Sequence, residues 1–497
     1  MFTGSESTAV FLIVFAAFVI LTLSYNRSKA YGKLGTLAWL QSVVLMAPWL
    51  VFFILFALGI YLNLVGVLAL LLVSVGVYIW IGRQLRAAGQ DIIIQQQAAK
   101  RLKEENLEEN PVDISKEQVV STEFVPISEE DLAKIKSVFS IDTFFTTETI
   151  PYQEGAIFKG NLRGEPESSH LKMSQRLKTE LGEKYRLFLV ESPEEKPVVV
   201  ILPSKNDPPT TTLAQKNLAL VLLVATIVTS LEASGLLLGF DLFSNWGRYS
   251  EAVPLSLGLW AVLIAHESGH LIVAKRNNIR LSLPFFLPTW QIGSFGAITR
   301  FESLLPNRTA LCDISLAGPA LGGLISLALL ITGMVMSHPG SVFQLPTEFF
   351  KASVLVGSLA KVIFGSALQE TIVDVHPLVV VGWLGLVITA LNLLPAGQLD
   401  GGRVVHAIYG RKIARRTTVA TLIVLGIITL ANPGNPIPLY WAVLILFLQR
   451  DLERPALNEI TEPDDTRAAW GLLALFLMLA TLIPLTPSLA GSLGIGG

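Results

Sequence analysis

The sequence predicts a multi-spanning α-helical membrane protein that carries a small α+β soluble domain. Of the 497 residues, 52% are hydrophobic and only 15% are charged, whereas soluble proteins usually carry about 25% charged residues. The charges are also unevenly distributed, because 40 of the 76 lie between residues 82 and 216. The net charge of −2 excludes a strongly basic nucleic-acid-binding protein, and the single cysteine excludes an internal disulfide.

Apolar segments on both sides of this polar region are expected to cross a membrane, because a spanning helix needs about 20 apolar residues. The expected spans are 8–24, 37–58, 64–81, 217–240, 252–274, 310–336, 377–394 and 468–485. Two shorter segments, 417–431 and 437–448, are predicted to form a hairpin, and 353–364 is predicted to be interfacial or re-entrant. Lys and Arg clusters follow four of the spans, which places the polar region on the cytosolic side, or on the stromal side in a plastid.

The domain organisation follows from these segments. We predict a three-span anchor at 1–82, a charged helical linker at 83–125, the α+β domain at 126–212, a membrane-embedded core at 213–450 and a C-terminal span at 451–497. Inside the α+β domain, a capping-box-like start at Ser128 and helical spacing at 168–181 indicate two helices. The β-rich runs 185–191 and 197–202 indicate a hairpin of two strands.

A short motif in the α+β domain is open to two interpretations. It reads Gly160-Asn161-Leu162-Arg163-Gly164. The first interpretation is a Gly-Asn turn before a helix. The second is a small binding surface built around Arg163.

The residues that indicate chemistry lie in the middle of the span 252–274. His266, Glu267 and His270 form an H-E-x-x-H pattern. Residues four apart share one helical face, so both imidazoles are placed to bind one zinc ion. Because ionisable residues are costly inside a membrane, three of them in five positions favour a functional site. The alternative is a set of polar residues that satisfy one another inside the helix bundle.

Zinc held by two histidines needs a third protein ligand and one open position. Asp400 is the best candidate, because it lies near the cytosolic end of its span at a depth that matches the histidine pair. Pro395 and the glycines after Asp400 are expected to break the helix. Within a membrane, non-helical backbone of this kind is tolerated only where it lines a protein cavity. The alternative is that Asp400 is an ordinary residue of a cytosolic turn.

These residues predict a hydrolytic mechanism with one Zn²⁺ per chain. Glu267 would take a proton from a zinc-activated water and pass it to the leaving amine. Asn392 would hydrogen-bond the substrate backbone. Segment 281–300, which contains Gly293, Phe295 and Gly296, is too interrupted to span and is predicted to capture unwound substrate along a strand edge.

With Asn392-Leu-Leu-Pro395 and Leu399-Asp400-Gly401, the histidine motif resembles the site-2 protease family of intramembrane zinc metalloproteases. Ser315-Leu-Ala-Gly318-Pro319 resembles that family's Gly-Pro helix start. The motif at 160–164 is similar to the plastid and cyanobacterial branch, the ethylene-dependent gravitropism-deficient and yellow-green proteases. The resemblance covers about residues 130–450. It implies zinc, the lipid bilayer and membrane-anchored protein substrates. Because no transit peptide is seen, a cyanobacterial plasma or thylakoid membrane is favoured, and a plastid membrane is the alternative.

Two other classes of protein compete with the protease. A divalent-metal transporter would also place His and Asp within spans, but it would not need a glutamate directly after the first histidine. A non-proteolytic scaffold or chaperone would use the α+β domain to hold clients, and its activity would survive Glu267→Gln.

Overall fold

A computed structural model describes residues 4–29, 32–57, 66, 70, 73–85, 127–152, 154–432, 434–435, 437–449 and 451–495. The chain divides into two compact units. The first comprises Met1–Glu123, Thr210–Ser256 and Leu283–Phe295, and the second comprises Phe124–Pro209, Leu257–Ser282 and Gly296–Gly497. The predicted linker lies almost entirely outside the described residues, and of the predicted span 64–81 only residues 66, 70 and 73–81 are described, all of them helical.

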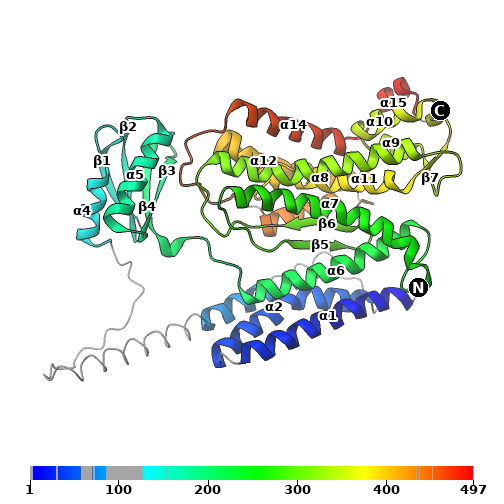
Figure 1. Cartoon of the computed structure of the whole chain (residues 1–497), viewed down its shortest axis with the longest axis horizontal. Coiled ribbons are helices and arrows are strands. Elements are labelled where there is room, and N and C mark those ends of the chain that lie inside the picture. Colours follow the sequence, from blue (N-terminus) through cyan, green and yellow to red (C-terminus); the bar gives the residue numbers. More distant parts are fainter. Residues whose placement is uncertain are drawn as a thin grey trace. The chain divides into compact units, whose positions relative to one another are not determined.

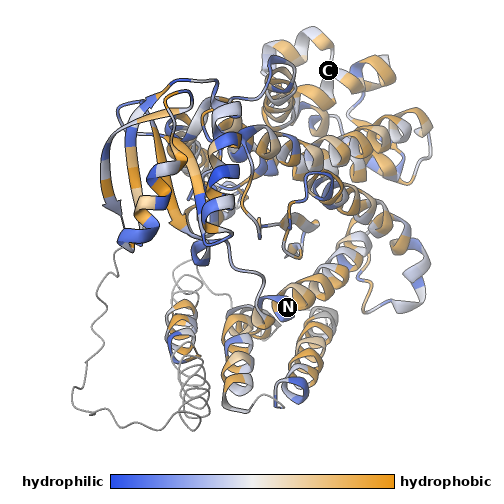
Figure 2. Cartoon of the chain, turned by 60° about the vertical axis from the view of Figure 1, so that its left-hand side comes forward, coloured by the Kyte–Doolittle hydropathy of each residue, from blue (hydrophilic) through white to orange (hydrophobic). Residues whose placement is uncertain are grey.

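The fold class is that of a multi-span helical membrane protein with a small strand-containing domain, as predicted. Within the described residues, seven helices are long and apolar enough to cross a membrane, judged by length and composition. Figure 2 shows the apolar residues that dominate these helices. The seven segments are Val10–Ser28, Leu34–Val51, Leu213–Leu237, Trp246–Arg276, Arg308–Met336, Asp400–Ala431 and Asp465–Leu482.

The first unit is built on three helices that pack against one another, α1 (Gly4–Ser28), α2 (Gly32–Ala57) and α6 (Leu213–Leu237). A buried amide joins them, because Asn217 Nδ2 donates to Ser24 Oγ at 2.7 Å and to Ser42 Oγ at 3.2 Å. Strand β5 (Phe285–Thr289) packs on α6 and pairs with β6 (Gly293–Ile298) (Figure 1). The predicted strand edge in segment 281–300 is therefore confirmed as a β-hairpin.

In the second unit, the α+β domain is a four-stranded antiparallel sheet of order β1-β2-β4-β3. Its elements are α4 (Glu129–Val138), β1 (Phe144–Tyr152), β2 (Gly155–Leu162), α5 (Pro166–Leu181), β3 (Tyr185–Glu191) and β4 (Pro197–Pro203). The two helices and the β3–β4 hairpin were predicted, and Ser128 caps α4 by accepting from Asp131 N. Large buried side chains such as Phe144, Phe158 and Met173 form one core between the helices and the sheet.

Strands β1 and β2 were missed, and the turn interpretation of Gly160-Asn161-Leu162 is wrong. These residues are the end of β2, paired with β1. The reason is that β1 lies at an edge of the sheet and is largely exposed, with threonines at three positions around its start. A strand of this kind lacks the alternation of apolar and polar residues that indicates a half-buried strand.

The rest of the second unit is a bundle of helices. α8 (Arg308–Met336) packs against α11 (Pro377–Asn392), α12 (Asp400–Ala431) and α14 (Asp465–Leu482), and α7 (Tyr249–Arg276) runs from the first unit into the second. Shorter helices complete the bundle, namely α9 (Glu348–Lys351), α10 (Val354–Phe364), α13 (Ile437–Leu444) and α15 (Pro487–Leu493). Two further short strands, β7 (Phe343–Pro346) and β8 (Ile372–Val375), pair with each other.

Three expectations about these helices need comment. Segment 353–364 is a helix of 11 residues, which is too short to span, as predicted. Segment 417–431 is the second half of the 32-residue helix α12, which packs against α13 and whose backbone leaves helical geometry at Gly410. Pro319 lies well inside α8 rather than at a helix start.

A strand-like connection links the α+β domain to the helical bundle. Leu189 of β3 donates its N–H to Leu457 O at 2.8 Å and accepts from Glu459 N at 2.9 Å. The same segment continues to the loop before α8, because Leu457 N donates to Leu305 O at 2.8 Å. Main-chain hydrogen bonds thus pair the N–H and the carbonyl of Leu189 at the β3 edge of the sheet, where edge strands otherwise present unpaired groups.

Candidate metal centre

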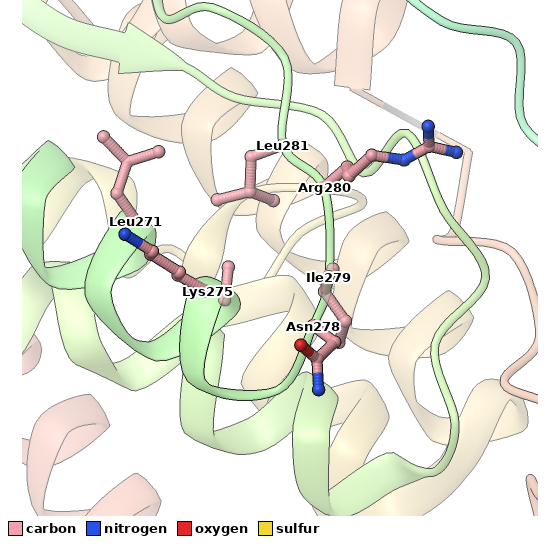
Figure 3. Close-up of a pocket in the computed structure, with 7 residues that line it drawn as sticks. Leu271, Lys275, Asn278, Ile279, Arg280 and Leu281 are labelled. Carbon is pink, nitrogen blue, oxygen red and sulfur yellow. The ribbon is translucent and has the colours of Figure 1, made fainter.

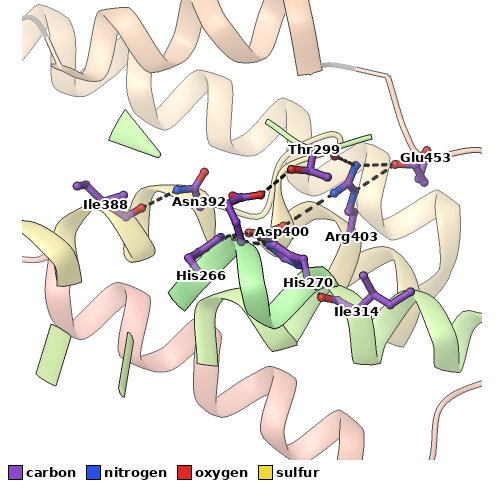
Figure 4. A network of polar contacts seen from close by, with 10 residues as sticks. His266, His270, Thr299, Ile314, Ile388, Asn392, Asp400, Arg403 and Glu453 are labelled. Carbon is purple, nitrogen blue, oxygen red and sulfur yellow. Dashed lines mark hydrogen bonds and ion pairs between the residues drawn. The ribbon is translucent and has the colours of Figure 1, made fainter. Parts of the chain in front are cut away.

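The two histidines of the predicted motif lie on one face of α7 and meet Asp400 from the first turn of α12. Their side chains are buried, with 6%, 5% and 7% of the surface of His266, His270 and Asp400 exposed. Within the described residues, this is the one group of three or more metal-ligating side chains whose ligand atoms converge. Figure 4 shows the three side chains pointing toward one another.

The spacing of the ligand atoms matches a tetrahedral zinc site. The His266 and His270 Nε2 atoms are 3.2 Å apart, and Asp400 Oδ2 lies 3.2 Å and 3.4 Å from them. Zinc ligands at about 2.0–2.1 Å in tetrahedral geometry are about 3.3 Å from one another. Two imidazole nitrogens and a carboxylate oxygen are also a donor set typical of zinc, so the residues fit the ion.

Helix α8 orients one of the ligands. His270 Nδ1 lies 2.8 Å from the carbonyl oxygen of Ile314. Because a carbonyl can only accept, Nδ1 donates, and the lone pair of Nε2 faces the other ligands. Glycines make this approach possible, because a Cβ at Gly269 would lie 2.3 Å from Ala317 O and one at Gly318 would lie 2.2 Å from His270 Nε2.

Asp400 is positioned by the break between α11 and α12. The 16 residues of α11 rise about 24 Å, so the helix ends before crossing a hydrocarbon core of about 30 Å. The prediction that 377–394 forms a span is therefore wrong. The chain turns through Leu393–Leu399 and enters α12 at Asp400. The expectation that the paired glycines break the helix is wrong, because Gly401 and Gly402 lie in the first turn of α12. They allow tight packing instead, since a Cβ at Gly401 would lie 1.8 Å from Leu393 O.

Glu267 is buried beside the ligands, with 8% of its surface exposed, and it is held by a residue that sequence reasoning missed. Thr299 Oγ1 donates to Glu267 Oε2 at 2.7 Å. Arg403 in turn donates from Nη2 to Thr299 O at 2.9 Å and forms an ion pair with Glu453 at 3.0 Å. Two weak signals were present in the sequence, because Thr299 lies within the segment 281–300 that was predicted to carry a strand edge and Arg403 lies three residues after Asp400. Nothing in the sequence around Glu453 indicated this partner.

The predicted substrate-binding residues separate into two groups. Gly296 and Asn392 come together, because a Cβ at Gly296 would lie 2.7 Å from Asn392 Nδ2, and Gly296 has a φ of +103°. Pro395 lies in the break before α12, where its carbonyl accepts from Thr421 Oγ1 at 3.4 Å. Gly293 and Phe295 belong to the first unit, where the Gly293 carbonyl accepts from a threonine of α6 at 2.7 Å.

The motif at 160–164 makes local contacts within the α+β domain. A Cβ at Gly160 would lie 2.1 Å from Phe145 O, and one at Gly164 would lie 2.6 Å from Ser169 Oγ. Arg163 donates its backbone N–H to Thr143 O at 2.9 Å, and its side chain is exposed. The glycines are therefore explained by close packing of β1, β2 and α5.

The comparisons with known proteins agree with this geometry. Residues 133–208 match the EGY3 middle domain, and residues 254–432 match peptidase family M50. "Probable zinc metalloprotease EGY2, chloroplastic" of Arabidopsis thaliana is 41% identical over 357 residues, which are 70% of this chain and 63% of that protein. "Probable zinc metalloprotease EGY1, chloroplastic" of the same plant is 34% identical over 421 residues, which are 76% of this chain and 75% of that protein.

The rice relative named "Probable zinc metalloprotease EGY2, chloroplastic" from Oryza sativa subsp. japonica is 39% identical over 382 residues, 76% of this chain and 69% of that protein. The chain thus spans 63% of the length of the Arabidopsis EGY2 protein and somewhat more of the other two. Among solved structures, no significant match to the chain is found.

Proposed function

The chain belongs to peptidase family M50, the site-2 protease family, and from this premise we propose that it is an intramembrane zinc metalloendopeptidase. Its substrates would be membrane-anchored proteins, cut in or near their transmembrane segments. The observation that carries the proposal is the buried triangle of His266, His270 and Asp400 ligand atoms with Glu267 beside it.

His266, His270 and Asp400 would hold the zinc ion, and Glu267 would act as general base and acid. When bound, zinc supplies a Lewis acid that acidifies water and polarises a carbonyl group. Glu267 directly follows His266 in the helix, so its carboxylate lies close to the position where a zinc-bound water would be. From there it would accept the proton of the water and return it to the nitrogen of the leaving amine.

Asn392 and the β5–β6 hairpin would bind the substrate. A peptide bond inside a helix is protected by its own hydrogen bonds, so the substrate segment must first be unwound. An extended segment can then pair with a strand edge. Gly296 and Asn392 support this role, because the end of β6 and the polar amide come together on the helical bundle that holds the metal ligands. Pro395, Gly293 and Phe295 are likewise proposed to bind substrate.

A plastid membrane is the proposed location. The relatives named above are described as chloroplastic, and the chain carries several helices of spanning length. The cyanobacterial membrane expected from the sequence receives no support from these relatives. Which side of the membrane the α+β domain faces, and the role of the motif at 160–164 in binding, stay predictions.

The test compares wild type with Glu267→Gln, each in detergent-free nanodiscs with a single-span model substrate and at equal zinc content. Glutamine keeps the size of the side chain and removes the base. We expect cleavage by wild type and at least a 100-fold loss in the variant, because general-base catalysis contributes about 10²–10⁴. Equal cleavage by both proteins would refute the role of Glu267. Zinc flux into liposomes without cleavage would favour the transporter, and client binding that survives Glu267→Gln would favour the scaffold.

A further inference from the structure

The carboxylate of Glu267 is fixed on one side only. Thr299 Oγ1 donates to Oε2 at 2.7 Å. Among the described residues, no hydrogen bond to Oε1 is recorded. A hydrogen bond to a carboxylate is stronger than one between neutral groups, and it restricts the rotation of the group that accepts it. Oε2 is therefore held in place, and Oε1 can accept a hydrogen bond from water.

Thr299 itself is held by a buried arginine. Arg403 Nη2 donates to the carbonyl of Thr299 at 2.9 Å, and Arg403 Nε donates to Glu453 Oε2 at 3.1 Å. The same guanidinium approaches Asp400, with 3.9 Å between Nη1 and Oδ1, and it stacks over the ring of Phe301 with 4.7 Å to the centroid. One side chain thus connects Thr299, the residue directly after β6, with a ligand of the metal centre (Figure 4).

We propose that Thr299 is a positioning residue that orients Glu267 and that Arg403 fixes Thr299 relative to Asp400. This inference rests on the proposed protease function. It explains why a polar residue follows directly on β6, which ends at Ile298. Because Thr299 continues the strand that is proposed to bind substrate, a substrate seated on that strand also stabilises the position of the base.

The test uses two variants that separate the hydroxyl of Thr299 from the shape of its side chain. Thr299→Val keeps the branched shape and removes the donor, whereas Thr299→Ser keeps the donor and removes a methyl group. We expect Thr299→Val to lower kcat about 10- to 100-fold, the effect of losing one hydrogen bond to a charged group. KM and zinc content should stay at the wild-type values, and Thr299→Ser should restore most of kcat.

Two results would overturn the inference while the protease stands. One is a wild-type kcat for Thr299→Val together with loss of cleavage in Glu267→Gln. The other is an equal loss in Thr299→Ser and Thr299→Val, which would assign the effect to packing. Cleavage that persists unchanged in Glu267→Gln would overturn the proposed function and this inference together.

A second, independent feature is a pocket of about 410 Å³ at the end of α7 (Figure 3). Four of its lining residues are apolar and two are cations; the full set is Leu271, Ala274, Lys275, Asn278, Ile279, Arg280 and Leu281. Lys275 and Arg280 are exposed. In the part of the chain that the structure describes, neither of them forms an ion pair. Arg308, Arg403 and Arg467, by contrast, each have a carboxylate partner.

The neighbouring helix surface is that of a lipid-facing segment. Leu271 and Ile272 have 49% and 62% of their surfaces exposed, directly before the charged end of α7. Cations at the end of a spanning helix lie at the depth of lipid headgroups. The geometry points to a binding site for an anionic membrane lipid, with its phosphate held at Arg280 and an acyl chain along Leu271.

The test measures how much phosphatidylglycerol stays bound to the full chain after transfer from mixed phosphatidylglycerol–phosphatidylcholine nanodiscs into detergent. Arg280→Gln removes a cation that lines the pocket. Arg276→Gln removes an exposed cation from the same helix end that does not line it. We expect about a fivefold loss of bound lipid for Arg280→Gln, the effect of one basic residue at a membrane surface, and less than a twofold loss for Arg276→Gln.

Equal losses in both variants would overturn the pocket, because they would indicate a diffuse surface charge. Displacement of the lipid by millimolar inorganic phosphate would overturn the lipid assignment in favour of a site for the free anion. Equal retention of phosphatidylcholine and phosphatidylglycerol by wild type would overturn the role of Arg280.

Discussion

Gly318→Ala replaces no metal ligand, but the added methyl group should prevent the metal centre from binding zinc. A Cβ at this position would lie 2.2 Å from His270 Nε2, 2.5 Å from Cδ2 and 2.6 Å from Cε1. Carbon atoms in contact are about 3.5 Å apart, so the imidazole must move by about 1 Å. Its Nδ1 is bonded to the Ile314 carbonyl, which limits the directions in which the ring can turn.

The magnitude follows from the tolerance of a zinc site. Ligand distances in such sites vary by only about 0.2 Å, so a ring displaced by about 1 Å is lost as a ligand or binds with strain. For Gly318→Ala we expect about a 100-fold loss of zinc affinity, at the upper end of what disturbing the support of a metal ligand costs. Cleavage should fall in proportion to the zinc content.

The assay is zinc content against a series of chelator concentrations, with cleavage measured on the same samples. Gly323→Ala is the matched control, because it adds the same methyl group to the same helix, where the nearest atom is Thr389 Cγ2 at 3.6 Å. That control should bind zinc like wild type. Equal zinc affinity in Gly318→Ala and Gly323→Ala would refute the reasoning from the Cβ distances.

Three further predictions concern stability. Asp131→Asn should destabilise the α+β domain by about 1–3 kcal/mol. A lysine ammonium bonded to Asp131 lowers the pKa of this carboxyl. The contribution of the carboxylate to the free energy of unfolding is therefore complete above about pH 4 and is lost as the pH falls through the lowered pKa. In thermal melts, the difference between Asp131→Asn and wild type should be smaller at pH 3 than at pH 7. Gly160→Ala should unfold the domain at lower denaturant, because its Cβ would lie 2.1 Å from a carbonyl of β1, whereas Arg163→Ala should change the free energy of unfolding by less than about 0.5 kcal/mol. His406 and Glu459 form a buried hydrogen-bonded pair at 2.5 Å. His406→Leu should lower the free energy of unfolding by about 3–5 kcal/mol, because it leaves Glu459 buried without its partner. The double variant His406→Leu with Glu459→Leu should recover much of that loss in the same thermal melts.

The sequence by itself determined the parts of this protein that depend on local spacing. Continuous apolar stretches gave the spanning helices, because a membrane leaves few ways to satisfy a backbone. The placement of His266, Glu267 and His270 on one helix followed from the helical period alone. The meeting of Asp400 with them was also predictable, because both segments approach the same end of the membrane core.

The tertiary structure decided what depends on partners far apart in the chain. Strand β1 lies at a sheet edge with little apolar patterning, so its pairing with β2 left no local signal. Residues 401–402 allow close backbone packing rather than a helix break, which only the neighbouring Leu393 carbonyl reveals. The link from Thr299 through Arg403 to Glu453 joins residues that are 104 and 50 positions apart. Such contacts have no sequence period, because they arise where separate elements meet, and only the folded chain brings them together.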